Sequence, residues 1–562
     1  MRRVRELRVG RCDSRISRRG EWATLRRRPE AAHVGIAATE SGPVSRRADR
    51  VVRGPEQQVN APMAARQARK VDLSTICTVL LAGAGTATLG AFLLSPSVPS
   101  TALLSVVMVT AFALVASRWP LAAGLAWLVL SPVLYPFARY PRSGTLLTFD
   151  RAYLSALALM LLLTRGVGRP GATGVRAFVK AVTVFAVVFL FRALTTHPGT
   201  LGALQIFIDA ILLPCIAFAV CRRTADSPRR LRAWAAGLMV CGTCVALLGI
   251  TEHFFGYELA TLSGGVVRTD TEVAGFVRVS GPYANPEVYS LTLALTLAAT
   301  LFWWTSAGTD GSRRKGAPAL VGPLLAAVQI TGMAFSLFRV AWACALLVVF
   351  LGLGLRVGKR LRLAAMAVAV ALGALILFVP LQDSDMFRAR MGNTANVAGR
   401  FATYQVGLDI WRSAPIAGVG INQFVEAQKR VDAKVVWGVR SVQSPHSSFI
   451  GTLAEQGVLG FTALLAVCGY GTRMLRRLGR AARKDATCQV LHAAVVAGAL
   501  AYLAFSVELT MLPLGPSNVV LAVLLGLAAS AVDTAQRRPT RQQATRAGAE
   551  RAVRAPLVEP AS

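Results

Sequence analysis

The sequence predicts an all-α, polytopic membrane protein, and three observations lead to that prediction. Hydrophobic residues make up 54% of the 562 residues and charged residues only 16%. The apolar residues are gathered in blocks of about 18 to 22, the length that a helix needs to cross roughly 30 Å of hydrocarbon. These blocks are apolar on all sides, as expected of helices surrounded by lipid and by other helices.

The length of these blocks predicts about fourteen transmembrane helices. They cover residues 75–95, 100–117, 120–137, 146–164, 178–194, 201–221, 234–255, 286–306, 318–336, 340–356, 361–381, 448–471, 488–508 and 517–534. The predicted organisation is therefore a disordered basic tail, eleven helices, a large loop with short amphipathic helices, three helices and a second disordered basic tail, at 1–72, 73–381, 382–447, 448–535 and 536–562.

The basic residues indicate how the helices are oriented. The chain has 62 Lys and Arg against 28 Asp and Glu, a formal net charge of +34. Most of them lie in the two tails and in alternate connections, at 165–176, 222–232, 313–315, 356–362 and 473–484. By the positive-inside rule, these connections and both termini are cytoplasmic, which predicts a multi-pass protein of the plasma membrane. The basic surplus is thus a topology signal that also attracts membrane lipids, and we expect no nucleic-acid partner.

This orientation places two long connections, 256–285 and 382–447, on the outer side. In the second, Phe401, Tyr404, Leu408 and Trp411 recur at helical spacing and Pro415 ends the run, which predicts an amphipathic helix on the membrane surface. A glycine turn and a second short helix are expected in 417–431. Long ordered loops of membrane proteins are usually functional, so the extracytoplasmic loop 382–447 is the predicted catalytic region.

The outer side also carries one histidine and several arginines. His446 directly precedes the span at 448–471, and the arginines include Arg278, Arg339, Arg400, Arg412 and Arg440. A guanidinium group can hold two phosphate oxygens at once. A neutral imidazole can take a proton from a hydroxyl, and neighbouring arginines keep it neutral by lowering its pKa. Such a set is suited to transferring a group from a lipid-linked phosphate to an alcohol.

Four stretches resemble the motifs of the O-antigen ligase and polymerase superfamily. His446-Ser447, nine residues and then Gly457-Val458-Leu459-Gly460 is similar to the histidine signature of O-antigen ligases. The other stretches are "RVSGPYANPE" (278–287), "FRVAWACALL" (338–347) and "GRFATYQVGLDIWRSAPIAGVGINQF" (399–424). They occur in the order found in that superfamily.

The resemblance implies an inverting, metal-independent glycosyltransferase that works without a cofactor. Its donor would be a glycan on undecaprenyl diphosphate, and its acceptor a hydroxyl of a glycan, lipid or protein outside the membrane. Carried over by motif, His446, Arg278 and Arg339 would be catalytic and Arg400 would bind substrate. Arg412 and Arg440 lie in the same loop and are further candidates for substrate binding.

Three functions remain open at this point. Glycan ligation and repeat-unit polymerisation share their chemistry and differ only in the acceptor. A transporter or lipid-linked glycan flippase is the third, and it should show paired charges near the membrane midplane or broken helices in repeated halves. Asp209 and Gln205 are the main polar residues deep in a predicted span, and no internal repeat is evident. The sequence therefore favours an enzyme.

Four glycines of these motifs have simpler roles than substrate binding. Gly418 and Gly420 fit a tight turn better than a phosphate-binding nest, and Gly457 and Gly460 fit close helix packing. No metal site is expected, because the Cys241–Cys244 pair lies inside a predicted span without further ligands.

The predicted topology can be tested by labelling. A cysteine introduced in place of Gln428 should react with a membrane-impermeant maleimide in intact cells, because the predicted loop faces outward. The unsubstituted protein gives the background. Reaction only after the membrane is breached would reverse the topology and remove the basis for the catalytic assignments.

Overall fold

The computed structural model describes residues 118–135, 148–163, 172–256, 272–273, 276–283, 285–306, 318–354, 395–430, 444–511 and 514–554. Contacts divide the chain into two units, 1–70 and 71–562, and all of these residues lie in the second. The predicted tail 1–72, the spans at 75–95, 100–117 and 361–381, and Arg440 lie outside the described residues.

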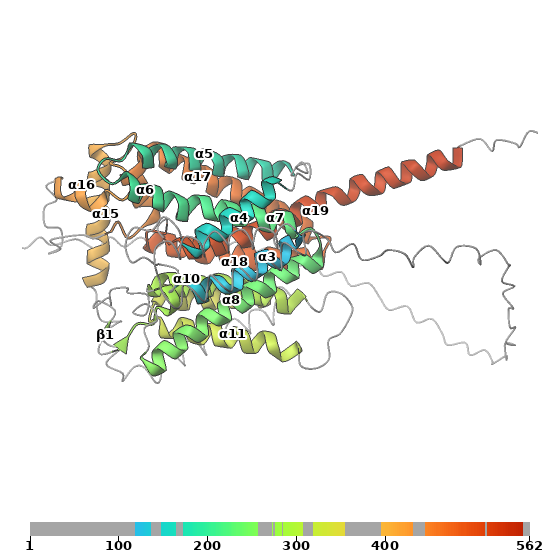
Figure 1. Ribbon diagram of the computed structural model, residues 1–562, viewed down its shortest axis with the longest axis horizontal. Helices are drawn as coiled ribbons and strands as arrows, with labels where there is room; N and C mark the ends of the chain where they lie inside the picture. The colour runs from blue at the N-terminus through green and yellow to red at the C-terminus, as the bar shows by residue number, and fades with distance from the viewer. Residues whose placement is uncertain are drawn as a thin grey trace, which may run out of the picture. The chain divides into compact units, whose positions relative to one another are not determined.

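The described part of the chain is helical apart from one small hairpin, which supports the all-α prediction (Figure 1). The hairpin pairs β1 (Glu272–Val273) with β2 (Phe276–Val277) in antiparallel fashion. The helices are α3 (Pro120–Leu134), α4 (Phe149–Leu163), α5 (Thr173–Thr195), α6 (Thr200–Phe207), the π-helix η2 (Ile208–Leu212), α7 (Leu213–Thr224), α8 (Pro228–Phe255), the 3-10 turn η4 (Gly281–Tyr283), α10 (Pro286–Ser306), α11 (Pro318–Phe335), α12 (Arg339–Gly354), α15 (Ala395–Ser413), α16 (Phe424–Arg430), α17 (Ser448–Ala482), α18 (Ala486–Glu508) and α19 (Gly515–Arg554).

Within the described residues, seven helices are long and apolar enough to cross a membrane. They are α5, the continuous stretch α6–η2–α7, α8, α10, α17, α18 and the first part of α19, and α3, α11 and α12 contain shorter apolar helices. Each of these, and α4, coincides with one predicted span. The predicted count of fourteen is not confirmed, because three of those spans fall outside the described residues.

Helix α10 lies at the centre of the packed helices and contacts α8, α11, α12, α18 and α19. Its interior side is partly polar: the Gln329 amide of α11 donates to the Thr300 hydroxyl (3.0 Å) and to the Met239 carbonyl of α8 (3.3 Å). In contrast, Val187 and Phe191 of α5 are about 60% exposed. A hydrocarbon environment favours this arrangement, in which polar groups are hydrogen-bonded among the packed helices and apolar side chains lie on their outer surface.

One ion pair lies among the apolar helices. Arg151 of α4 donates to both carboxylate oxygens of Asp209 in η2, at 2.7 and 2.6 Å, and Arg151 is only 8% exposed. The sequence drew attention to Asp209 but not to its partner. Because each charge neutralises the other, the pair joins α4 to η2 without leaving an isolated charge in the apolar region.

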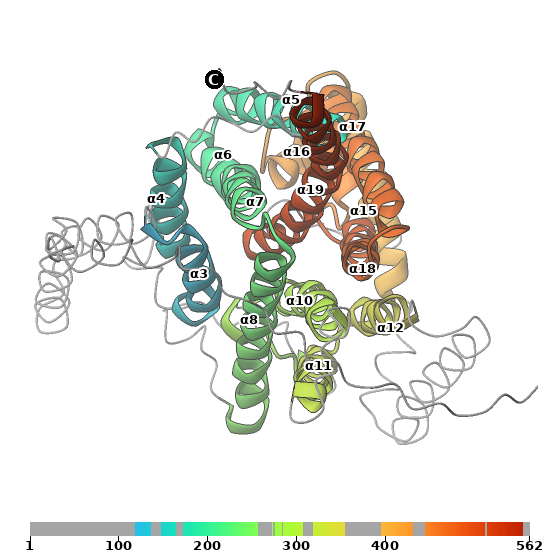
Figure 2. The same ribbon diagram turned by 90° about the vertical axis from the view of Figure 1, so that its right-hand side faces the viewer.

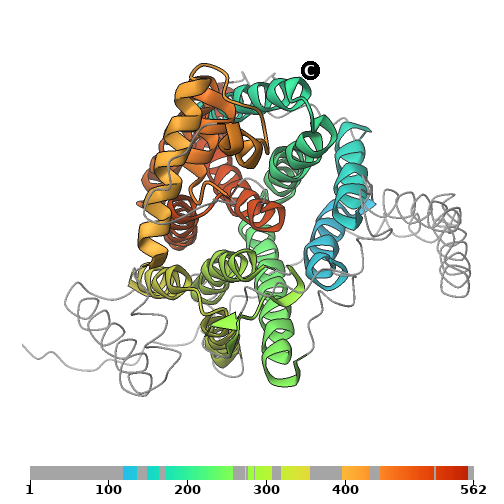
Figure 3. The same cartoon turned by 90° about the vertical axis from the view of Figure 1, so that its left-hand side faces the viewer.

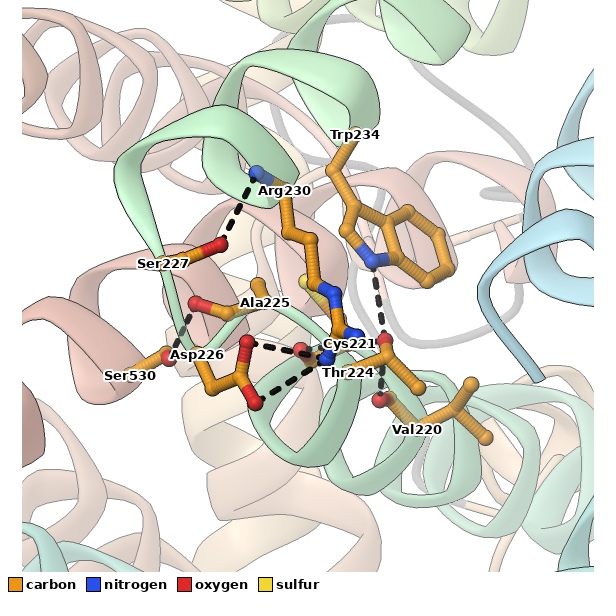
Figure 4. A network of polar contacts seen from close by, with 9 residues as sticks. All are labelled: Val220, Cys221, Thr224, Ala225, Asp226, Ser227, Arg230, Trp234 and Ser530. Atoms are coloured by element: carbon orange, nitrogen blue, oxygen red, sulfur yellow. Dashed lines mark hydrogen bonds and ion pairs between the residues drawn. The ribbon is translucent and has the colours of Figure 1, made fainter. Parts of the chain in front are cut away.

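The end of the helices that carries the basic connections is joined by polar contacts (Figure 4). Trp234 of α8 donates to the Thr224 hydroxyl at the end of α7 (2.9 Å). Ser530 of α19 donates to the Ala225 carbonyl (2.6 Å), and Arg230 pairs with Asp226 at 3.0 Å. These contacts connect the ends of α7 and α8 with α19.

Helix α17 is broken at Gly457, which has φ 63° and ψ −164°. The break frees backbone groups, and the loop 415–420 binds them. The amides of Val419 and Gly420 donate to the carbonyls of Ala454 and Glu455, both at 3.0 Å. In return, the amides after the break, Val458 and Leu459, donate to the carbonyls of Pro415 (2.9 Å) and Ile416 (3.3 Å). The loop therefore supplies hydrogen bonds that an unbroken helix would make with itself.

The glycines at this junction allow two backbones to touch. A Cβ on Gly418, which has φ +70°, would lie 2.3 Å from the carbonyl carbon of Glu455. A Cβ on Gly457 would lie 2.3 Å from the carbonyl oxygen of Ile416. The tight turn predicted at Gly418 and Gly420 is confirmed, and both residues have positive φ. The prediction that Gly457 allows close packing of helices is wrong. The backbone that approaches Gly457 belongs to a loop, and the conformation of Gly457 itself breaks the helix.

Helix α15 lies across the ends of α17 and α18 (Figures 1 and 3) and ends two residues before Pro415, as predicted. Ala402, Val406 and Ile410 form the stripe that is buried against the protein, whereas Phe401, the first residue of the stripe predicted to lie on the membrane surface, is exposed. The smaller side chains let α15 approach α17, whereas Phe401 stays 57% exposed and available to a membrane surface.

Helix α19 differs from the predicted organisation at its carboxyl end. It continues to Arg554, into the stretch 536–562 that was predicted to be a disordered tail. The segment is rich in Ala, Arg, Gln and Glu, which have high helix propensity, and this accounts for the longer helix.

A glycine substitution can test the junction between α17 and the loop. Gly457→Ala should lower the free energy of unfolding by about 1 to 3 kcal/mol, because the positive φ and the backbone contact both oppose a Cβ. Thermal unfolding of purified protein measures this.

Gly469→Ala in the same helix is the matched control, because a Cβ there meets nothing within 4 Å. It should be neutral or raise stability by roughly 0.5 to 1 kcal/mol, since alanine favours helix. Equal stability of the two variants would contradict the proposed role of Gly457.

Candidate active site

The last turn of α18 connects elements that are far apart in the sequence. Glu508, at its carboxyl end, forms an ion pair with Arg400 of α15. One residue earlier, the Val507 carbonyl accepts from the Tyr404 hydroxyl (3.1 Å). Helix α15, with its motif arginine, is thereby held over the end of α18.

The same turn contacts two further motifs. The Leu509 carbonyl, directly after α18, accepts from the Ser448 hydroxyl at the start of α17 (2.9 Å). The Phe505 ring packs against the Phe338 ring at a centroid distance of 5.2 Å. The histidine motif, the loop motif and the 338–347 motif therefore meet around residues 505–509.

His446 lies just before α17 with φ 44°, a left-handed conformation that is uncommon for residues other than glycine. The next residue, Ser447, is the N-cap of the helix. Such strained conformations often occur at functional sites. The chain direction at this point is set by the Ser448 contacts, since its hydroxyl also accepts from the Met511 amide (2.8 Å).

The electrostatic surroundings keep His446 neutral. Burial lowers the pKa of His446 below its ordinary value of 6.5, and the Arg400 guanidinium lowers it further. The Glu508 carboxylate acts in the opposite direction. The predicted direction is therefore right, but burial and not arginine charge is the larger cause. A neutral imidazole at neutral pH is the form that can accept a proton.

Arg278 and Arg339 are linked through the turn between α11 and α12. The Arg278 side chain donates from Nε to the Ser336 carbonyl (3.3 Å), and its guanidinium lies 5.9 Å from the centroid of the Phe338 ring. Arg339 follows Phe338 directly and is the first residue of α12. Leu337 in this turn has φ 51°, a second left-handed residue at a motif.

Buried Glu252 fixes the loop that carries Arg278. Its carboxylate accepts from the amides of Ser280 (3.1 Å) and Gly281 (2.6 Å) and from the Ser280 hydroxyl (3.2 Å). Asn285 caps α10 beyond the loop, accepting from the Glu287 amide at 2.8 Å. The backbone of the 278–287 motif is thus anchored at both ends, which limits where Arg278 can reach.

The structure does not bring every predicted site residue to this cluster. Arg412 forms an exposed ion pair with Asp409 at 2.6 Å. It lies twelve residues after Arg400 in α15, which corresponds to about 18 Å along the helix axis. Arg440 is outside the described residues. The described contacts therefore place His446 near Arg400 and connect Arg278 to the same turn of α18 through the rings of Phe338 and Phe505. Arg339 joins this group by following Phe338 in the chain, and Arg412 lies apart from it.

Three residues of the site were not found by sequence reasoning: Glu508, Glu252 and Arg192. Arg192 of α5 donates to the Gly418 carbonyl (3.0 Å) and so holds the loop that docks at the α17 break. Each is a charged residue near the end of an apolar block. A charge in such a position is costly unless it is partnered or functional, and this was the available signal.

The two carboxylate oxygens of Glu508 have different surroundings. Glu508 Oε1 contacts Arg400, whereas the buried Oε2 has no hydrogen-bond partner among the described residues. Buried polar atoms are normally satisfied, so an acceptor without a partner is an unusual feature of this turn. No group of three or more potential metal ligands occurs in the described part of the chain.

The surroundings of His446 lead to a testable titration. In wild-type protein its NMR resonances should titrate with a midpoint below 6.5. Arg400→Gln should move that midpoint up, because a lowering charge is lost, and Glu508→Gln should move it down. Shifts in the same direction for both variants would contradict this arrangement of charges. The His446→Gln spectrum identifies the resonance.

Comparison with known protein families matches residues 323–465 to the O-Antigen ligase family. The matched region includes Arg339, Arg400, His446 and the glycines of the α17 break, and Arg278 lies outside it. No curated protein matches the chain. The match over residues 323–465 confirms the superfamily resemblance predicted from the histidine and arginine motifs.

Proposed function

We propose that this protein is a glycosyltransferase that moves a glycan from undecaprenyl diphosphate to an acceptor hydroxyl at the outer face of the plasma membrane. The O-antigen ligase domain indicates ligase or polymerase chemistry in general. The observation that carries the specific proposal is the placement of His446 beside the Arg400–Glu508 ion pair, at the turn of α18 that also contacts the Phe338–Arg339 motif.

In this proposal, His446 is the general base. An imidazole nitrogen takes the proton of the acceptor hydroxyl while the hydroxyl oxygen bonds to the anomeric carbon of the donor sugar. The bond between that carbon and the diphosphate oxygen breaks, and the configuration at the carbon inverts. The lowered pKa of His446 keeps the base free at neutral pH.

Arg278 and Arg339 are proposed to bind the diphosphate. Negative charge develops on the leaving diphosphate, and fixed guanidinium groups at the edge of the membrane stabilise it. The Phe338 ring beneath Arg278 and the Ser336 carbonyl fix the orientation of that guanidinium before the donor arrives. Arg400, Arg412 and Arg440 remain proposed substrate-binding residues, with Arg400 best placed.

Repeat-unit polymerisation is the alternative with the same chemistry, and the acceptor decides between them. The glycan profile of a deletion strain separates the two. Long chains that remain on the lipid carrier indicate a ligase, whereas single units attached to the acceptor without long chains indicate a polymerase.

The proposed role of the arginines predicts the effect of conservative changes. Arg278→Lys and Arg339→Lys should each lose nearly as much donor affinity and turnover as the alanine variants, because lysine keeps the charge but loses the forked geometry. Arg229→Lys, an exposed arginine at the opposite end of the helices, is the control. Full activity of both lysine variants would show that charge alone suffices.

The proposed base predicts a separate effect on turnover. His446→Ala should lower turnover by about 10² to 10⁴, the usual contribution of a positioned base, with little change in donor affinity. His197→Ala is the control: His197 is an exposed histidine outside the proposed site, so this variant should retain turnover.

Purified protein with a lipid-linked donor allows turnover and donor affinity to be measured separately. Normal turnover of well-folded His446→Ala protein would eliminate the base role, and a loss confined to donor affinity would place His446 at the diphosphate.

A further inference from the structure

A large cavity lies among α5, α7, α17, α18 and α19; Figure 2 shows the arrangement of these helices. Its volume is about 1770 Å³, above the roughly 300 to 1,000 Å³ of a typical small-molecule site. Aromatic and aliphatic side chains dominate its walls, among them Phe178 and Phe185 of α5, Phe218 of α7, Leu464 of α17 and Leu503 of α18. The cavity is thus suited to a long hydrocarbon ligand.

The cavity extends along most of the thickness of a membrane. Its lining on α19 runs from Asn518 to Arg537, and these two residues are about 28 Å apart along the helix axis. The hydrocarbon core of a bilayer is roughly 30 Å thick. Extended acyl chains can therefore lie in the cavity parallel to the helices.

One end of the cavity is basic. Arg176, Arg223, Arg476 and Arg537 line it there, one from each of α5, α7, α17 and α19. Two acidic residues, Asp226 and Asp533, lie at the same rim, and each forms an ion pair with an arginine outside this group of four. Asp226 pairs with Arg230 at 3.0 Å (Figure 4), and Asp533 pairs with Arg222 at 2.9 Å.

We propose that this cavity binds an anionic phospholipid, with its acyl chains among the apolar walls and its phosphate at the four arginines. Basic pockets between transmembrane helices are a known site type for anionic headgroups. The positive-inside rule explains why arginines are found at this end of the helices. It does not explain why arginines of four different helices line one apolar cavity.

This lipid site is distinct from the proposed glycan-transfer site. Arg476 lies nineteen residues after Gly457 in α17, about 28 Å along the helix, and His446 precedes that helix at its other end. The lipid phosphate and the proposed donor diphosphate would therefore occupy opposite ends of the helices.

The headgroup assignment is tested by lipid binding to purified, delipidated full-length protein. Phosphatidylglycerol and phosphatidylcholine with identical acyl chains serve as probes, and native mass spectrometry measures their dissociation constants. Phosphatidylglycerol should bind at least tenfold more tightly. Arg176→Gln and Arg476→Gln should each weaken its binding about fivefold. Arg480→Gln, one turn beyond Arg476 but outside the cavity lining, should not.

The apolar part is tested by filling the cavity. Ala186→Trp places an indole in the lining and should abolish phosphatidylglycerol binding. Val184→Trp, an exposed position of the same helix outside the lining, should leave it intact. Size-exclusion chromatography and thermal unfolding identify any variant that fails to fold. If Ala186→Trp fails to fold, Arg176→Gln and Arg476→Gln decide whether the cavity binds phosphatidylglycerol.

Equal affinity for the two phospholipids would overturn the proposal, and so would unchanged binding in both arginine variants. A third contrary result would be that undecaprenyl phosphate displaces phosphatidylglycerol and that Ala186→Trp no longer binds this carrier. The last would assign the cavity to the glycan carrier. Glycan transfer by Arg176→Gln and Arg476→Gln in detergent, with donor supplied, should equal wild type. Failure of the lipid site and failure of the proposed enzyme are therefore distinguishable.

Discussion

The arrangement of the site depends on one constraint: a helix broken within or near the membrane must have its freed backbone groups satisfied by other parts of the protein. Gly457 breaks α17, and the loop 415–420 provides both donors and acceptors for the exposed groups. That exchange ties the end of α15 to the start of α17. Since Arg400 lies on α15 and His446 precedes α17, the break determines which motif residues can meet. Glycine at 418 and 457 is needed because two backbones touch there.

A second layer of contacts converts this junction into a defined site. The end of α18 holds α15 through Glu508 and Val507, α17 through Leu509, and the α11–α12 turn through Phe505. Three parts of the matched region, namely α15, the start of α17 and the α11–α12 turn, are thus held by a helix that lies outside it. The family match over 323–465 therefore contains Arg339, Arg400 and His446 but not Glu508, the ion-pair partner of Arg400.

The sequence predicted the features that depend on local pattern and left out those that depend on contact. Apolar block length located eleven described helices, and Pro415 and the Gly418–Gly420 pair correctly marked a helix end and a turn. The break at Gly457 was not predicted, because a glycine in an apolar run is equally consistent with close packing. The stripe by which α15 packs on the protein was not predicted: the aromatic residues mark the face expected at the membrane surface, whereas the smaller Ala402, Val406 and Ile410 fit against α17. Partners such as Glu508 and Arg151 become evident only when the helices are placed side by side.

The electrostatics of the site must satisfy two opposing requirements. In the proposed reaction, binding of a diphosphate needs positive charge, whereas the general base must be unprotonated at neutral pH. Burial of His446 meets the second requirement, because it disfavours the imidazolium before any arginine contributes. Burial also makes an unpaired arginine costly, and Glu508 offsets that cost at Arg400 while drawing the pKa of His446 only partly back. The ion pair thus allows a cation to remain next to a neutral imidazole. Without Glu508, Arg400 would lower the pKa of His446 further but would be held less firmly. Without Arg400, Glu508 would raise the pKa of His446 and so favour the protonated form, which cannot act as a base.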